Sequence, residues 1–147
     1  MPRRILVVED NALNRRLFAH VLDMAGFRVV EAADGTAGLA AVEQERPDLV
    51  LLDLDLPGLS GFEILSRIRA DGSFDGMPVL AVSAIVTQST EARVLALGCA
   101  AYLPKPVRPS ELLAAIDAAL NSSTEVTRAA GGRWAASDGG AIRLQEG

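Results

Sequence analysis

The sequence predicts an α/β fold, a (βα)5 unit whose five parallel strands form a doubly wound sheet with helices on both faces. Short apolar runs alternate along the chain with stretches of helical periodicity, which is the pattern of repeated βα units. The central run, 48–53, is apolar between its terminal aspartates, as in a strand that is covered on both faces. Right-handed crossovers between successive strands then place helices on both sides of one parallel sheet.

Five short runs are predicted as strands because they are aliphatic or β-branched and are bounded by turn or helix signals. The first of them, Ile5-Leu6-Val7-Val8, is too brief for a helix and is followed directly by acidic residues. The predicted strands are 5–8, 27–32, 48–53, 79–82 and 100–103.

Five helices are predicted between and after these strands. The first has an apolar stripe with helical spacing, formed by Leu13, Leu17, Phe18, Val21 and Leu22. Gly26 is a typical residue to end this helix, Pro47 limits the second helix, and Pro109 suits the first turn of the last one. The predicted helices are 13–25, 35–46, 61–70, 90–97 and 109–120.

The composition indicates one folded domain and excludes several classes of protein. Of 147 residues, 50% are hydrophobic and 22% charged, so the chain can bury a sizeable core. The 14 Lys+Arg and 19 Asp+Glu give a net charge of −5 with no basic run, which argues against direct nucleic-acid binding. The one cysteine cannot form an internal disulfide. No apolar run suits a signal peptide or a membrane span, so we expect a cytoplasmic protein without membrane insertion.

The last part of the chain differs in composition. Residues 122–147 contain five of the 13 glycines and few large apolar residues, so we predict a folded domain over 1–121 and a flexible C-terminal tail over 122–147. Trp134, the only tryptophan, leaves open a short docking segment in this tail. The tail has neither the length nor the helical pattern of a DNA-binding output domain.

Acidic side chains follow two of the predicted strands at their carboxyl ends, where ligands bind in a parallel α/β sheet. Glu9 and Asp10 follow the first strand, and Asp53 ends the third, with Asp55 two residues later. Two carboxylates about 4 Å apart repel by roughly 4 kcal/mol at an effective dielectric constant near 20, so a compensating cation is expected. Because Mg²⁺ favours one or two carboxylates with water and phosphate oxygens, we predict a Mg²⁺ site at this edge.

A hydroxyl and a lysine follow two further strands. Ser83-Ala84 comes after the fourth strand, and the fifth continues into Lys105-Pro106. Lys105 is the only lysine among the 14 basic residues, which indicates that a compact ammonium is needed there rather than the wide fork of an arginine. Pro106 permits a cis Lys105–Pro106 bond, which would direct the ammonium toward the sheet edge.

Together these groups predict a site for a tetrahedral anion. A carboxylate beside Mg²⁺ can attack phosphorus in line, while the metal and Lys105 neutralise the phosphoryl oxygens. The Ser83 hydroxyl and nearby backbone N–H groups can donate to the same oxygens. The expected product is an acyl phosphate on Asp53.

These motifs resemble the receiver domain of bacterial two-component response regulators. The resemblance covers residues 3–120 and rests on the order and spacing of four motifs, each weak alone. The motifs are Val7-Val8-Glu9-Asp10-Asn11, Asp53 followed by Leu56-Pro57-Gly58, Ser83-Ala84, and Lys105-Pro106. Residues 9–18 and 98–102 are most similar to single-domain DivK-type regulators. The resemblance implies a flavodoxin-like receiver fold with strand order 2-1-3-4-5.

The resemblance also implies a role for each site residue. Asp53 corresponds to the phosphoacceptor and a metal ligand, and Asp10 to a direct Mg²⁺ ligand. Glu9 corresponds to the acid that acts largely through water, and Asp55 to the position that offers its backbone carbonyl to the metal. The implied phosphate-binding and switch residues are Ser83, Ala84, Lys105 and Tyr102.

The implied partners are proteins. The donor would be a phosphohistidine on a histidine kinase or a histidine phosphotransfer protein. On phosphorylation Ser83 would turn inward and Tyr102 would follow, which changes the affinity of a downstream protein for the face formed by helix four, strand five and helix five. The protein assists phosphotransfer and its own dephosphorylation but turns over no free substrate, so we do not class it as an enzyme. The sequence leaves open a homodimer and the effect of Asp55 on the phosphoryl lifetime.

Two alternative functions would use some of the same residues. Asp53-Leu54-Asp55 after an apolar strand resembles the nucleophile motif of haloacid-dehalogenase-type phosphohydrolases. Against that function, the remaining acids lie upstream at Glu9-Asp10 rather than downstream of Lys105, and there is no cap domain. The second alternative is a receiver-like module that acts by protein contact without phosphorylation, which the presence of every site residue disfavours.

Overall fold

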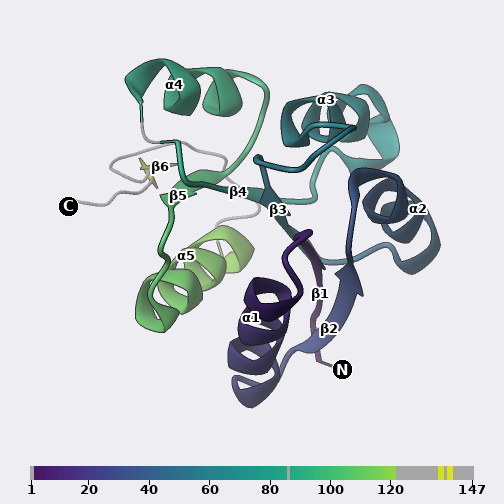
Figure 1. The fold of residues 1–147 in the computed structure, drawn as a ribbon, viewed down its shortest axis with the longest axis vertical. Helices are drawn as coiled ribbons and strands as arrows, with labels where there is room; N and C mark the ends of the chain where they lie inside the picture. Colours follow the sequence, from purple (N-terminus) through teal and green to yellow (C-terminus); the bar gives the residue numbers. More distant parts are fainter. Residues whose placement is uncertain (1, 86, 122–135, 138, 141–147) are drawn as a thin grey trace.

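A computed structural model describes residues 2–85, 87–121, 136–137 and 139–140. Five parallel strands form one sheet in the order β2-β1-β3-β4-β5 (Figure 1). The strands are β1 (Arg4–Val8), β2 (Arg28–Ala32), β3 (Leu49–Asp53), β4 (Val79–Ser83) and β5 (Ala101–Pro104). The helices are α1 (Ala12–Met24), α2 (Gly35–Glu45), α3 (Gly61–Ala70), the 3-10 helix η1 (Gly72–Phe74), α4 (Gln88–Ala96) and α5 (Pro109–Asn121). The predicted fold class and strand order are confirmed.

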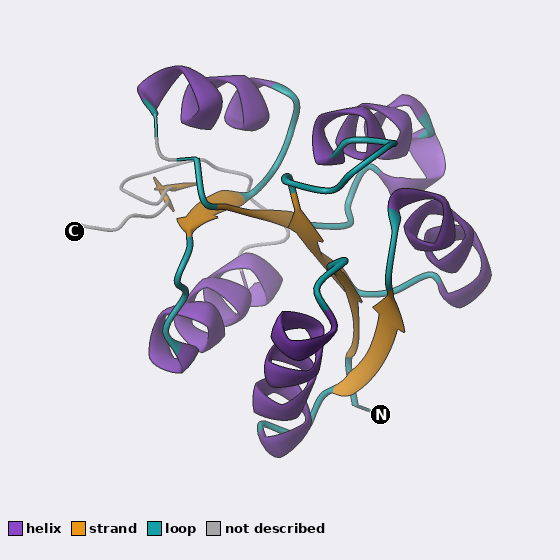
Figure 2. Cartoon of the chain, viewed as in Figure 1, coloured by secondary structure: helices purple, strands orange, loops and turns teal. Residues whose placement is uncertain are grey.

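Helices cover both faces of the sheet, with α1 and α5 on one side and α2, α3 and α4 on the other (Figure 2). Alternate residues of each strand face opposite helical layers. In β1, Ile5 and Val7 pack with α1 and α5, whereas Leu6 and Val8 pack with the other layer. Both faces are therefore apolar, which explains why β3 and β4 have no polar residue before their last positions.

The strand register explains how the site is assembled. Val8 of β1 pairs with Leu52 of β3, so the next residues along the two chains, Glu9 and Asp53, lie side by side at the edge of the sheet. Residue 53 in turn pairs with Val82, and Ser83 at the end of β4 pairs with the last residue of β5. Four segments far apart in sequence thus end at one edge of the sheet.

The predicted element bounds agree with the structure to within two residues, but the predicted stripe of the first helix is partly wrong. Leu22 is fully buried, whereas Leu13 and Leu17 are 68% and 54% exposed. One residue turns an α-helix by about 100°, so five residues separate Leu17 and Leu22 by about 140° around the axis. The two leucines cannot both face the sheet, so the apolar stripe that faces the sheet is narrower than predicted. The short helix η1 was not predicted.

The predicted C-terminal tail lies largely outside the described residues, and so does Trp134. Only β6 (Ala136–Ser137) and β7 (Gly139–Gly140) are described there, as an antiparallel pair. In the described part of the chain, no helix combines the length and the apolar character that a membrane crossing requires.

Gly61, the first residue of α3, is required by the close approach of the helix to the end of β3. A Cβ at this position would lie 2.5 Å from Leu54 Cα and 2.7 Å from the Asp53 carbonyl oxygen. We expect Gly61→Ala to lower the free energy of unfolding by about 2 kcal/mol in urea denaturation, because backbone beside Asp53 must shift. Gly76→Ala is the control, since nothing lies within 4 Å of its added Cβ. Equal effects of the two variants would contradict the prediction.

Candidate functional site: an acidic pocket with one lysine

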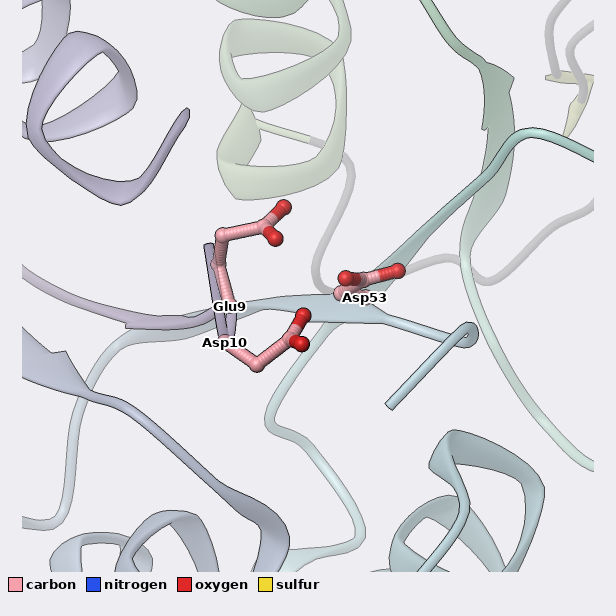
Figure 3. Close-up of side chains that lie close together, drawn as sticks. All are labelled: Glu9, Asp10 and Asp53. Carbon is pink, nitrogen blue, oxygen red and sulfur yellow. The ribbon is translucent and has the colours of Figure 1, made fainter. Parts of the chain in front are cut away.

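Three carboxylates gather at the carboxyl ends of β1 and β3 (Figure 3). Oxygen atoms of Glu9, Asp10 and Asp53 all lie within 4.8 Å of one another. Glu9 and Asp53 are 1% and 2% exposed, whereas Asp10 is exposed to solvent. The cluster therefore has a buried base and an open side, as a site for an exchangeable ligand requires.

Backbone amides fix the two buried carboxylates. The Asn11 N–H donates to Glu9 Oε2 at 3.1 Å, and the Asp55 N–H donates to Asp53 Oδ1 at 2.8 Å. The guanidinium of Arg15 donates to the Glu9 carbonyl at 2.9 Å, which holds the end of β1 to α1. Arg15 was not among the predicted site residues, because neither its position in a helix nor its charge indicates a bond back to the carbonyl six residues earlier.

Lys105 lies between the two buried carboxylates. Its Nζ is 3.3 Å from Glu9 Oε1 and 3.3 Å from Asp53 Oδ2, and its bond to Pro106 is cis. Partial burial lowers the pKa of Lys105, but the charges of Asp53 and Glu9 raise it by more, so the net shift is upward. The ammonium therefore stays charged and is the counter-charge of the pocket.

The buried oxygens are not fully satisfied by this lysine. Within the described residues, Glu9 Oε1 and Asp53 Oδ2 are buried and accept no hydrogen bond, although both are in ion-pair contact with Lys105. Buried polar atoms of this kind need an explanation. Three carboxylates with one ammonium leave excess negative charge, and their oxygens are the ligand type that Mg²⁺ prefers. The donor set therefore fits a Mg²⁺ ion.

The burial of the cluster also affects the protonation of Glu9. Burial raises the pKa of Glu9 from 4.5 to about 7; the Asn11 N–H opposes this shift, and the negative charge of Asp53 adds to it. Near neutral pH, ionisation of Glu9 therefore destabilises the folded state unless a cation binds in the pocket.

Without Mg²⁺, we expect the free energy of unfolding to fall as the pH rises from about 5 to about 7.5. Between the unfolded and folded pKa values of Glu9, the folded state binds more protons, so deprotonation destabilises it. At about 1.4 kcal/mol for each pH unit between the two pKa values, this contribution is roughly 3 kcal/mol. Urea denaturation along this pH range would measure it. Glu9→Gln should flatten the dependence, and an unchanged slope in that variant would contradict the assignment to Glu9.

The other predicted site residues lie beside this pocket, joined by hydrogen bonds. The Ser83 hydroxyl donates to Asp55 Oδ1 at 2.8 Å, and the Ala84 N–H donates to Asp55 Oδ2 at 2.8 Å. The Tyr102 hydroxyl donates to the Ile85 carbonyl. Burial raises the pKa of Tyr102, which keeps this phenol protonated as a donor. The predicted contact of the Asp55 backbone carbonyl with a metal stays a prediction. The hydrogen bonds that the Asp55 side chain accepts from Ser83 and Ala84 were not indicated by the sequence.

Comparison with known families decides the classification. Residues 5–117 match the family described as "Response regulator receiver domain". The chain belongs to this family. Like other receiver domains, it is a phosphoacceptor of two-component signalling, a signalling protein rather than a classical enzyme. Neither the phosphohydrolase nor the phosphorylation-independent alternative is favoured by these matches.

Individual relatives support the same classification of this receiver. The polar-differentiation response regulator DivK of Brucella anthropi is 36% identical over 107 residues, which cover 73% of this chain and 87% of that protein. A CheY-like receiver domain protein of Methanospirillum hungatei has a TM-score of 0.79 at 31% identity, over 84% of this chain and 97% of that one. Chemotaxis protein CheY4 of Vibrio cholerae has a TM-score of 0.78 at 28% identity, over 82% of this chain and all of that one.

Membership in the family sets general expectations for this receiver. Receiver domains bind Mg²⁺, and the cluster of Glu9, Asp10 and Asp53 provides suitable ligands. Receiver domains also interact with histidine kinases or histidine phosphotransfer proteins and with downstream partners.

Proposed function

We propose that Asp53 is the phosphoacceptor and that Glu9, Asp10, Asp53 and the backbone carbonyl of Asp55 hold Mg²⁺. The observation that carries this proposal is the environment of Asp53, a buried carboxylate at a strand end with an oxygen 3.3 Å from the ammonium of Lys105. We assign the receiver to residues 1–121, because the first strand begins at Arg4 and α5 ends at Asn121.

The reaction we propose is transfer from a phosphohistidine. An Asp53 carboxylate oxygen forms a bond to phosphorus while the bond from phosphorus to the imidazole nitrogen of the donor breaks, and the imidazole takes up a proton. When bound, Mg²⁺ neutralises charge on the oxygens of the transferred group. Lys105 supplies a second positive charge to those oxygens, and the buried position of Asp53 limits the access of water.

We propose that phosphorylation is read out through Ser83, Ala84 and Tyr102. The Ser83 hydroxyl and the Ala84 N–H would donate to phosphoryl oxygens, and Tyr102 would change its position with the backbone of Ile85, to which it is hydrogen-bonded. These residues join the site to α4 and β5. A downstream protein would bind the face formed by α4, β5 and α5 with an affinity that depends on phosphorylation.

The test is direct phosphorylation of the purified protein. Incubation with acetyl phosphate, or with a phosphorylated histidine kinase, is expected to add one phosphoryl group when Mg²⁺ is present, as measured by intact mass. Removal of Mg²⁺ with EDTA should prevent it. The adduct should be labile to hydroxylamine, as an acyl phosphate is. No uptake from any donor with Mg²⁺ present, or a hydroxylamine-stable adduct, would overturn the proposal.

A further inference from the structure

One feature of the pocket belongs to neither the metal site nor the phosphoacceptor, and this is the side chain of Asp55. Its two carboxylate oxygens accept hydrogen bonds from two different donors, the Ser83 hydroxyl and the Ala84 N–H, both at 2.8 Å. A carboxylate bound by a hydroxyl and an adjacent amide has the contacts that two oxygens of a phosphoryl group would make. Asp55 therefore accepts hydrogen bonds from the same two donors that, in the proposed function, bind the phosphoryl group.

These two bonds continue into a longer chain of contacts. The Ile85 N–H donates to Ser83 Oγ at 3.0 Å, and the Ile85 carbonyl accepts the hydroxyl of Tyr102. Ser83 Oγ thus accepts from Ile85 while its single proton goes to Asp55. The Asp55 carboxylate is consequently connected by hydrogen bonds to the start of the β4–α4 loop. Through Ile85, it is also connected to Tyr102 of β5.

We propose that Asp55 is a positioning residue that holds the unphosphorylated state by competing, as an internal carboxylate, for the Ser83 and Ala84 donors. This inference rests on the proposed function, because it assumes that the phosphoryl group needs those donors. Ser83 has one hydroxyl proton and Ala84 one amide proton, so neither can donate fully to Asp55 and to a phosphoryl oxygen at the same time. Phosphorylation must then break both bonds before the loop and Tyr102 can move.

The expected size of the effect follows from the kind of bond. Hydrogen bonds to a charged acceptor are stronger than neutral ones, but Asp55 is exposed, so water replaces part of what is lost. Asp55→Asn keeps the size of the side chain and removes its charge and one acceptor oxygen. We expect the variant to bind a phosphoryl mimic about three- to tenfold more tightly than the unaltered protein.

The probe is beryllofluoride, a tetrahedral anion that mimics an acyl phosphate on aspartate, titrated into the full chain at saturating Mg²⁺. The dissociation constant for Mg²⁺ is measured separately for each protein, so that a change at the metal site is not mistaken for a change at the donors. Amide NMR signals of Ala84 and Ile85 report the binding. In the absence of both ligands, the same signals should shift in Asp55→Asn, and their hydrogen exchange should be faster.

A double-mutant cycle with Ser83→Ala separates competition from simple charge repulsion. Repulsion between Asp55 and the anion persists when Ser83 is removed, whereas the competition for its hydroxyl does not. We therefore expect the gain from Asp55→Asn to be clearly smaller in the Ser83→Ala background. Equal gains in both backgrounds would overturn the proposal, as would beryllofluoride binding that Asp55→Asn leaves unchanged or weakens.

Failure of the underlying function has a different signature. If the unaltered protein binds no beryllofluoride at saturating Mg²⁺, the proposed function fails and the competition fails with it. If it binds beryllofluoride and Asp55→Asn shows no gain, the competition is wrong while Asp53 stays the phosphoacceptor.

Discussion

The Asp53→Asn variant is expected to take up no phosphoryl group from acetyl phosphate or from a phosphorylated histidine kinase. An amide is a far weaker nucleophile than a carboxylate, and its oxygen cannot form a stable phosphoryl ester. The neighbouring carboxylates are unsuited to replace it. Glu9 is held by the Asn11 N–H, Asp10 is exposed to water, and the Asp55 carboxylate is held by Ser83 and Ala84. Intact mass and a radiolabelled donor would both measure this loss.

Asp55→Asn is the matched control, because it removes a carboxylate only two residues away and leaves Asp53 in place. It should still be labelled, whereas Asp53→Asn should not. Circular dichroism of both variants would verify that the fold is retained. Full labelling of Asp53→Asn under the same conditions would show that another group accepts the phosphoryl, and the assignment of the site would be wrong.

The placement of the site could be predicted from the sequence because it follows from topology. In a parallel sheet all strands end at the same edge, so acids after the first and third strands had to meet there. The register then brings Glu9 beside Asp53 and Lys105 beside both. This placement depends on the strand assignment and on the strand order that the resemblance to receiver domains implies, and not on side-chain conformation.

The details that could not be predicted depend on loop conformation and on helix orientation. The hydrogen bonds that Asp55 accepts from Ser83 and Ala84 join residues 28 and 29 positions apart, and they depend on the conformation of the chain after β3 and β4. Nothing in the local sequence specifies those turns. Likewise, the apolar spacing of α1 showed that a helix forms, but the rotation that leaves Leu13 and Leu17 exposed is set by packing against the sheet.

Lys105→Met is expected to change two affinities in opposite directions. The variant should bind Mg²⁺ several-fold more tightly, because the ammonium that competes for Glu9 Oε1 and Asp53 Oδ2 is removed. The same variant should bind beryllofluoride about tenfold more weakly or worse, because a charge that faces the anion is lost. Titrations of Mg²⁺ alone, and of beryllofluoride at saturating Mg²⁺, would measure the two effects separately.

Lys105→Arg is the control that keeps the charge and changes its shape. A guanidinium is wider and less strongly hydrated than an ammonium, so it cannot approach both carboxylate oxygens in the same way. We expect it to restore part of the beryllofluoride affinity while Mg²⁺ binds about as in the unaltered protein. If Lys105→Met lowered the affinity for both Mg²⁺ and beryllofluoride, the lysine would be acting through the fold of the pocket rather than through its charge. Opposite shifts in the two affinities are expected from charge alone, because the ammonium competes with Mg²⁺ for these carboxylate oxygens and attracts the negatively charged anion.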